Sequence, residues 1–146
     1  MKLFTIGFTK KTAEEFFNIL VKNNVKILID IRRNNKSQLA GFAKGVDLKY
    51  FLKKIANIDY IYFMDFAPSH TLLENYQKKK INWEQYEEEY LKQLNNYENW
   101  DFFNIEKFEN GCLLCSEETP LKCHRRLLAE FLMKKYHNMP IELIHL

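Results

Sequence analysis

The sequence predicts one α/β domain built on an open, mostly parallel, five-stranded sheet with helices on both faces, a Rossmann-like arrangement in three layers. Two observations support this fold class. Short apolar runs alternate along the chain with segments that carry helix-start signals, and such runs are typical of strands buried on both faces of a parallel sheet. The chain has 146 residues, the usual size of one domain, and no linker or repeat divides it. We therefore expect residues 1–146 to form a single α/β domain.

The first strand is expected at residues 3–8, an apolar run that includes Gly7. Thr12 and Glu15 then have the spacing of a capping box, in which each side chain accepts a hydrogen bond from the backbone at the start of a helix. Residues 26–31 are almost continuously apolar and rich in β-branched side chains, which predicts the second strand.

A polar loop containing glycine is expected over residues 34–45, followed by a helix that Asp47 caps and that ends near Ile55. The third strand is expected at residues 60–64. The stretch from 69 to 103 is long for a single crossover, so we predict a helical insertion between the third and fourth strands.

The insertion is expected to contain helices at residues 69–80 and 82–97, the second opening with a capping box of Asn82 and Gln85. Large side chains recur at helical spacing along this second helix: Trp83, Tyr86, Tyr90, Leu94 and Tyr97. Such a stripe is more often part of a core than a platform for stacking bases, and we interpret it as core.

The fourth strand is expected at residues 111–115 and the fifth at 141–144. Between them, Thr119 followed by Pro120 predicts an N-cap and a first helical residue, starting a helix that reaches about Tyr136. The inner face of this helix is expected to carry Leu121, His124, Leu128, Phe131 and Leu132.

Composition narrows the class of protein. A net charge of +3 is too small to indicate a nucleic-acid partner by itself. No apolar run approaches the length of a membrane span, and the N-terminus leads directly into a strand without a signal peptide. Three cysteines are an odd number, so we expect no disulfide framework and a cytoplasmic location.

The four arginines stand in two adjacent pairs, 32–33 and 125–126, and lysine supplies the other 18 of the 22 basic side chains. Arginine carries a planar fork of donors that grips carboxylate or phosphate at two points, whereas lysine suits a solvated surface. Both pairs are expected at the carboxyl edge of the sheet, where open α/β proteins bind ligands. They predict an anion-sized pocket there, although two structural ion-pair clusters remain an alternative.

The candidate catalytic residues are Cys115, Glu117 and His124. Cys115 and Glu117 are two apart and share a side of the chain if the strand stays extended that far. A thiol beside a carboxylate and an imidazole has the groups needed for nucleophilic and acid–base catalysis. Alternatively, Cys115 is a small buried hydrophobe and His124 a satisfied core residue.

The candidate substrate-binding residues lie at the same edge. Arg32 and Arg125 are expected to clamp an anion. Asp30 is either a catalytic carboxylate or, as we slightly favour, the partner of Arg32. Thr9 is expected near the start of the first helix, where free backbone N–H groups attract negative charge. Cys123 lies beside the arginines near a helix start, which favours its thiolate.

A zinc site is an alternative to this interpretation. Cys112 and Cys115 have the spacing of a zinc pair, with Cys123 and His124 as further ligands. However, residues three apart on a strand face opposite sides, whereas a zinc pair normally lies in a tight turn. We therefore predict no metal and no cofactor.

Several motifs together resemble the bacterial and archaeal family catalogued as domain of unknown function 488. They are Thr5-Ile6-Gly7, Asp30-Ile31-Arg32, Leu113-Leu114-Cys115-Ser116-Glu117, Pro120, Cys123-His124-Arg125 and Ile144-His145. The chain departs from the family pattern at Phe8 and Thr9, where His and Ser are usual, and at Asn35, where proline is common. The resemblance implies an α/β fold with these residues clustered, and it implies no activity.

Two classes of function fit these observations. The first, which we favour, is an enzyme that hydrolyses or transfers a group on an anionic substrate, such as a nucleotide, a nucleic-acid end or a phosphorylated metabolite. The second is a non-catalytic module that holds nucleic acid or another anion with both arginine pairs, Lys36 and the run 78–80. The expected partner is thus a small anion or nucleic acid and not a membrane, and the sequence does not indicate an oligomeric state.

Overall fold

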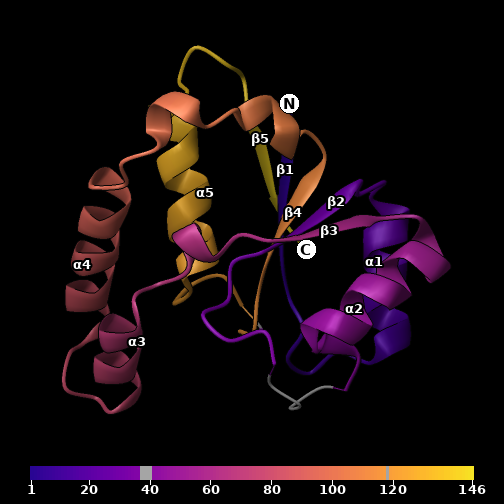
Figure 1. The fold of residues 1–146 in the computed structure, drawn as a ribbon, viewed down its shortest axis with the longest axis horizontal. Coiled ribbons are helices and arrows are strands. Elements are labelled where there is room, and N and C mark those ends of the chain that lie inside the picture. The colour runs from indigo at the N-terminus through magenta and orange to yellow at the C-terminus, as the bar shows by residue number, and fades with distance from the viewer. Residues whose placement is uncertain (37–40, 118) are drawn as a thin grey trace.

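The computed structural model describes residues 1–36, 41–117 and 119–146. Its centre is a sheet of five parallel strands in the order β3-β2-β4-β1-β5 (Figure 1). The strands are β1 (Lys2–Gly7), β2 (Ile27–Asp30), β3 (Asp59–Tyr62), β4 (Gly111–Cys115) and β5 (Glu142–His145). The five predicted strands are confirmed. β3 ends before the predicted Met64 because the chain there enters a 3-10 turn, Met64–Phe66.

The described residues also form five α-helices. They are α1 (Ala13–Lys22), α2 (Gly45–Phe51), α3 (His70–Gln77), α4 (Trp83–Asn95) and α5 (His124–Lys135). Both predicted capping boxes are confirmed, with Thr12 and Glu15 at the start of α1 and Asn82 and Gln85 at the start of α4. Within the described parts of the chain, no helix is long and apolar enough to cross a membrane.

The sheet separates two hydrophobic clusters. Side chains alternate along each strand, so that Leu3 and Leu113 belong to one cluster while Phe4 and Leu114 belong to the other. The first cluster takes its helical members from α3, α4 and α5, and the second from α1 and α2. Figure 1 accordingly shows α1 and α2 on one side of the strands, and α4 and α5 on the other.

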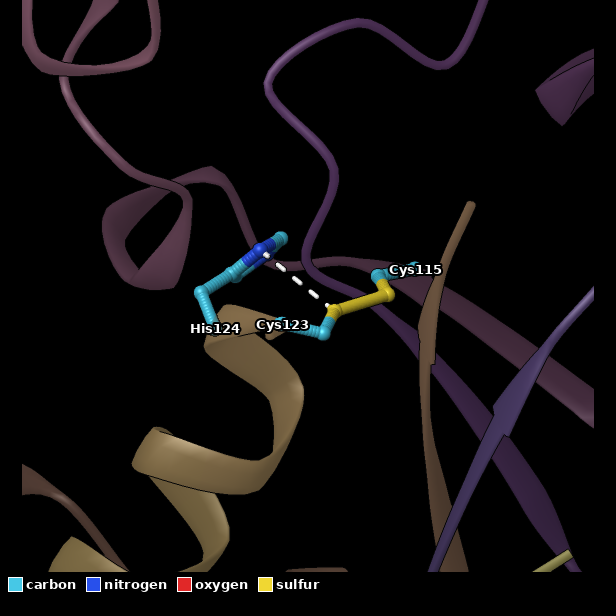
Figure 2. A group of neighbouring side chains, drawn as sticks. All are labelled: Cys115, Cys123 and His124. Carbon is cyan, nitrogen blue, oxygen red and sulfur yellow. Dashed lines mark hydrogen bonds between the residues drawn. A yellow bond between two sulfur atoms is a disulfide. The ribbon is translucent and has the colours of Figure 1, made fainter. Parts of the chain in front are cut away.

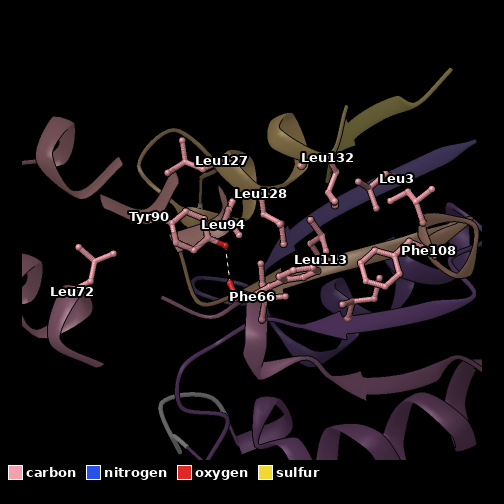
Figure 3. Close-up of a cluster of buried hydrophobic side chains, with 14 of the residues drawn as sticks. Leu3, Phe66, Leu72, Tyr90, Leu94, Phe108, Leu113, Leu127, Leu128 and Leu132 are labelled. Atoms are coloured by element: carbon pink, nitrogen blue, oxygen red, sulfur yellow. Dashed lines mark hydrogen bonds between the residues drawn. The ribbon is translucent and has the colours of Figure 1, made fainter. Parts of the chain in front are cut away.

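The predicted insertion between the third and fourth strands is present as α3 and α4. Most of the predicted stripe is core, because Tyr86, Tyr90 and Leu94 are buried. Trp83 and Tyr97 are only partly buried against the same cluster. The Tyr90 hydroxyl donates a hydrogen bond of 2.7 Å to the carbonyl of Phe66, a contact visible in Figure 3. This bond fixes α4 to the chain that leaves β3.

The helix predicted from Asp47 begins earlier, at Gly45, with Lys44 as its N-cap. The first turn forms there because the N–H of Gly45 donates to the carbonyl of Asn35, and the N–H of Leu48 donates to Lys44. Asp47 lies inside the first turn. Its negative charge interacts favourably with the helix dipole there, but its side chain does not cap the helix. The predicted loop at residues 34–45 partly lies outside the described residues, at 37–40.

The prediction that Thr119 and Pro120 start a helix is wrong. α5 begins at His124 with Cys123 as its N-cap, and Leu121 is 72% exposed instead of facing the core. The physical reason is that carbonyls before Cys123 are occupied by arginine side chains. Arg126 donates to the carbonyls of Pro120 and Leu121, and so holds this segment as a loop.

The connections of the sheet place the loops that follow β1, β2 and β4 together. The chain leaves β1 and β2 toward α1 and α2, whereas it leaves β4 toward α5 on the opposite face. β4 lies between β2 and β1, so neighbouring strands send their chains to opposite faces at this point. Crevices at such a reversal are the usual ligand sites of open α/β sheets.

Candidate functional site

A cavity of about 330 Å³ lies at this reversal, beyond the carboxyl ends of the strands. Its walls come from the loops after β1, β2 and β4, from α3 and α4, and from the start of α5. The chemically active side chains among the lining residues are Arg32, Arg33, Cys115, Glu117, Lys122, Cys123 and His124. A larger hollow of about 790 Å³ lies at the opposite edge, and its described walls contain no cysteine, histidine or arginine.

Arg32 enters the cavity wall as a buried cation held by one carboxylate. Its Nε and Nη2 atoms donate to the two oxygens of Asp30 at 2.8 and 2.6 Å, and its backbone N–H donates to the same group at 3.1 Å. Asp30 is fully buried and Arg32 is 5% exposed. The Tyr60 hydroxyl also donates to Asp30, at 2.6 Å. Asp30 is therefore the partner of Arg32 in this structure.

The remaining terminal nitrogen of Arg32, Nη1, differs from the other two because it donates no hydrogen bond to Asp30. Nη1 is buried and has no hydrogen-bond partner among the residues that the structure describes. The guanidinium carbon lies 5.3 Å from the centre of the Phe8 ring, which also lines the cavity. Burial of a charged donor without a partner is costly, so this nitrogen is suited to an acceptor supplied by a ligand.

Cys115 and Cys123 meet at the same place, joined as a disulfide (Figure 2). The sequence predicts no disulfide framework, and this single disulfide was not expected. The odd count concealed it, because the third cysteine, Cys112, is free and lies in the cluster against α1 and α2. The fold brings together the end of β4 and the N-cap of α5, which are 8 residues apart in sequence.

His124 is the first residue of α5 and is oriented by the backbone. Its Nε2–H donates to the carbonyl of Ile31 at 2.7 Å, since a carbonyl can only accept. In the neutral ring Nδ1 is then without a proton, and it faces the Cys123 sulfur at 4.0 Å (Figure 2). Burial lowers the pKa of His124 to about 4, so the ring is neutral at physiological pH.

Arg125 lies behind the sulfur atoms and does not line the cavity. It is fully buried, and Nη1 donates to the Cys115 sulfur at 3.0 Å and to the carbonyl of Glu117 at 2.6 Å. Burial lowers the pKa of Arg125 to about 10, which still leaves it charged at pH 7. The structure thus places this arginine as a support for Cys115 and for the loop after β4.

Glu117 and Thr9 lie on two different loops, after β4 and after β1, and make different contacts. The Glu117 residue is exposed and lines the cavity, while its carbonyl is used by Arg125. Thr9 lies outside the cavity lining, and its N–H and hydroxyl both donate to the carbonyl of Ser116. Thr9 therefore ties the loop after β1 to the loop after β4.

Gly7 is required for the close approach of these loops. A Cβ at this position would lie 1.6 Å from the Glu117 carbonyl oxygen and 2.8 Å from Arg125 Nη1. Gly7 is also the register partner of Cys115 across β1 and β4. This requirement is not visible in the sequence, because Glu117, which passes over Gly7, is 110 positions later in the chain.

The aromatic wall of the cavity was not predicted. Tyr76, Trp83 and Tyr86 line it opposite the loops, and the Trp83 and Tyr86 rings stack with centres 5.2 Å apart. The helical spacing of Trp83 and Tyr86 was visible in the sequence, but it indicated only a buried face. Arg126, in contrast, pairs with Glu130 at 3.1 Å and lies away from the cavity lining.

The site also contains a set of possible metal ligands. The donor atoms of Cys115, Cys123 and His124 all lie within 4.8 Å of one another. Cys112, which the sequence had suggested as a fourth member, faces the opposite cluster.

The fold and the site together define a parallel α/β protein with cysteine, histidine and arginine side chains gathered at the carboxyl edge of its sheet. The chain belongs to the family described as domain of unknown function DUF488, which matches residues 12–132 and confirms the resemblance. Comparisons with curated proteins and with solved structures give no match.

Proposed function

We propose that the protein is an enzyme that hydrolyses or transfers a group on an anionic substrate held in the 330 Å³ cavity. One observation carries this proposal. Arg32 is a 5% exposed cation in the cavity wall, and its Nη1 has no hydrogen-bond partner among the described residues. The same wall contains Cys115, Glu117 and His124, so an anion bound by Arg32 would lie among groups able to react.

The arrangement favours a division of roles. Asp30 and Tyr60 fix the guanidinium of Arg32, so little side-chain entropy is lost when the anion binds. In the reduced protein, the hydrogen bond from Arg125 stabilises negative charge on the Cys115 sulfur. His124 offers Nδ1 as an acceptor, and Glu117 offers a carboxylate.

The aromatic wall favours a nucleotide within the class of anionic substrates. Tyr76, Trp83 and Tyr86 form a cluster of rings on one side, and Arg32 lies on the side formed by the strand ends. A base can stack on aromatic rings at about 1–3 kcal/mol per base, while its phosphate satisfies the guanidinium.

Calorimetric titration with AMP and with inorganic phosphate tests this proposal. Arg32→Lys keeps the charge but removes the fork, and we expect it to weaken both ligands by at least about tenfold. Arg126→Lys is the matched control, because Arg126 pairs with Glu130 outside the cavity lining, and its affinities should equal those of the parent protein. Equal affinity of Arg32→Lys and the parent would contradict the proposal, as would a parent that binds neither ligand.

A second pair of measurements separates a nucleotide site from a nucleic-acid module. Trp83→Ala should weaken AMP and leave phosphate unchanged, because only the base contacts the aromatic wall. If an oligonucleotide instead binds more tightly than AMP, with an affinity that falls steeply as salt rises, the non-catalytic module is the better description.

A further inference from the structure

Cys115 at the end of β4, with Cys123 and His124 at the start of α5, offers the side chains of a metal site. We propose that the reduced protein binds one zinc ion through Cys115, Cys123 and His124, with the fourth coordination position open to the cavity. This inference differs from the sequence prediction of no metal, and it uses a different ligand set from the one considered there. It can be measured without any substrate, and so it stands apart from the proposed function.

The donor atoms are of the right kind and lie close together, and the two sulfur atoms, bonded in the structure, need only move apart on reduction to take zinc-ligand positions. Two thiolates and one imidazole nitrogen are ligands that zinc prefers, at about 2.3 Å for sulfur and 2.0–2.1 Å for nitrogen. A tetrahedral ion would therefore separate its ligand atoms by about 3.4–3.8 Å. The three donor atoms already lie within 4.8 Å of one another, with His124 Nδ1 at 4.0 Å from the Cys123 sulfur.

His124 is oriented as zinc ligands usually are. A metal-binding histidine almost always donates its other ring N–H to a carboxylate, a backbone carbonyl or water, which fixes the tautomer and the ring plane. Here Nε2–H donates to the carbonyl of Ile31 at 2.7 Å, and Nδ1 faces the Cys123 sulfur (Figure 2). The bond from α5 to the loop after β2 thus holds the imidazole in place before any ion arrives.

Cys115 has an outer partner of the same kind. Arg125 is fully buried, and its Nη1 donates to the Cys115 sulfur at 3.0 Å. Hydrogen bonds to a ligating thiolate reduce the charge that it carries and hold its position. Zinc with two thiolates and a neutral imidazole has no net charge, so the nearby guanidinium opposes it only weakly.

The set has three members, which leaves a position for a further ligand. Within the described part of the chain, no other cysteine, histidine or carboxylate belongs to the group, and Cys112 lies across the sheet in the other cluster. Three protein ligands with an open position are the pattern of catalytic zinc, whereas structural zinc is closed by four. All three residues line the cavity that Arg32 also lines, so an anion in that cavity could reach both the zinc and the guanidinium.

Zinc binding and the disulfide exclude each other. Added phosphine and water reduce the disulfide to two thiols, and the phosphine becomes its oxide. Zinc then binds both sulfur atoms and displaces one proton from each thiol. The same two cysteines therefore either form the bond seen in the structure or hold the ion, according to the redox state of the protein.

The experiment uses the full chain, reduced with a phosphine and stripped with a chelator that is then removed. Titration with Zn²⁺ and with Co²⁺ should show one equivalent bound. Co²⁺ should give the intense visible d–d bands of a tetrahedral site, together with sulfur-to-cobalt charge transfer in the near ultraviolet. Cys115→Ser, Cys123→Ser and His124→Gln should each weaken binding by more than about 100-fold, since even loss of an outer partner costs 10–100-fold. Cys112→Ser is the matched control and should bind as the parent does.

Two outcomes would overturn the proposal. One is a reduced parent that binds less than half an equivalent of either ion at micromolar concentration, a result that does not depend on whether any variant folds. The other is equal binding by Cys112→Ser and the three ligand variants. Arg32→Lys should retain full zinc binding, so that loss of anion binding in that variant and loss of metal binding in the cysteine variants can be distinguished. A shift of the cobalt bands on adding azide would support the open position.

Discussion

Asp30 and Arg32 form a buried ion pair in which the carboxylate accepts hydrogen bonds from two nitrogens of the guanidinium, while the third, Nη1, has no partner among the described residues. Arg32 lines the cavity. Tyr60 donates to the same carboxylate from β3. The pair therefore has two roles, since it joins β2 to its neighbour and fixes the cation on which the proposed anion site depends.

Asp30→Asn should destabilise the protein strongly. It leaves a buried guanidinium without a countercharge, which costs about 3–5 kcal/mol. Asp59→Asn is the control, because Asp59 pairs with Lys53 on the surface and its loss should change stability little. Urea unfolding of the three proteins measures the difference. Similar losses of unfolding free energy in both variants would show that the buried Asp30–Arg32 pair stabilises the fold no more than a surface pair does.

Tyr60 should make stability fall at alkaline pH. Burial and the nearby Asp30 raise the pKa of Tyr60 well above 10 in the folded protein. Between pH 10 and that raised value, the unfolded chain releases a proton that the folded chain keeps. The contribution of Tyr60 is thus complete below pH 10 and is lost as pH rises through this window, by at most about 1.4 kcal/mol per pH unit. Tyr60→Phe should lose less stability than the parent between pH 9.5 and 11.5, and identical slopes would refute the assignment.

Gly7→Ala should displace the loop after β4. The added Cβ would lie 1.6 Å from a backbone oxygen, so the loop must move, at a cost of about 3 kcal/mol or more. Gly41→Ala is the matched control, since no described atom lies within 4 Å of a Cβ there, and its effect should stay within about 0.5 kcal/mol. Thermal or urea unfolding compares the two. A Gly7→Ala protein as stable as the parent would mean that the loop does not pack against β1 as described.

The cysteines should differ in reactivity. In reduced, metal-free protein, iodoacetamide at pH 8 should modify Cys115 and Cys123, which line the cavity, before Cys112. Cys112 is fully buried in the other core, and burial raises the pKa of its thiol. Peptide mapping after timed labelling measures the three rates. Without reduction, the same mapping should find Cys115 joined to Cys123. Labelling of Cys112 as fast as the other two in the reduced protein would contradict the first expectation, and free Cys115 and Cys123 thiols in the unreduced protein would contradict the second.

The local signals in the sequence were reliable where the chain decides its structure by itself. The capping boxes at Thr12 and Asn82 use groups three residues apart, and both formed as predicted. The apolar runs likewise became strands. The start of α5 failed for the opposite reason, because Thr119 and Pro120 have a good local signal that is overridden by arginine side chains from the next turn of chain.

The site was predicted in part. The carboxyl edge, Asp30 as the partner of Arg32, and the nearness of Cys115 to His124 followed from strand polarity and from residue type. Three features did not follow: Arg125 behind the sulfur atoms, the disulfide with Cys123 and the aromatic wall. The first two depend on how the irregular loop between β4 and α5 folds back on itself, and the third depends on the packing of α3 and α4 beside the strand ends.

By itself, the sequence determined which residues form strands and helices and which edge of the sheet carries the polar groups, because periodicity, capping and strand direction act within a few residues. Only the tertiary structure decided that β4 lies between β2 and β1, that its loop crosses Gly7, and that Cys115 faces Cys123 and not Cys112. Those choices depend on packing two helical layers against one twisted sheet, and that packing energy is shared among residues throughout the chain.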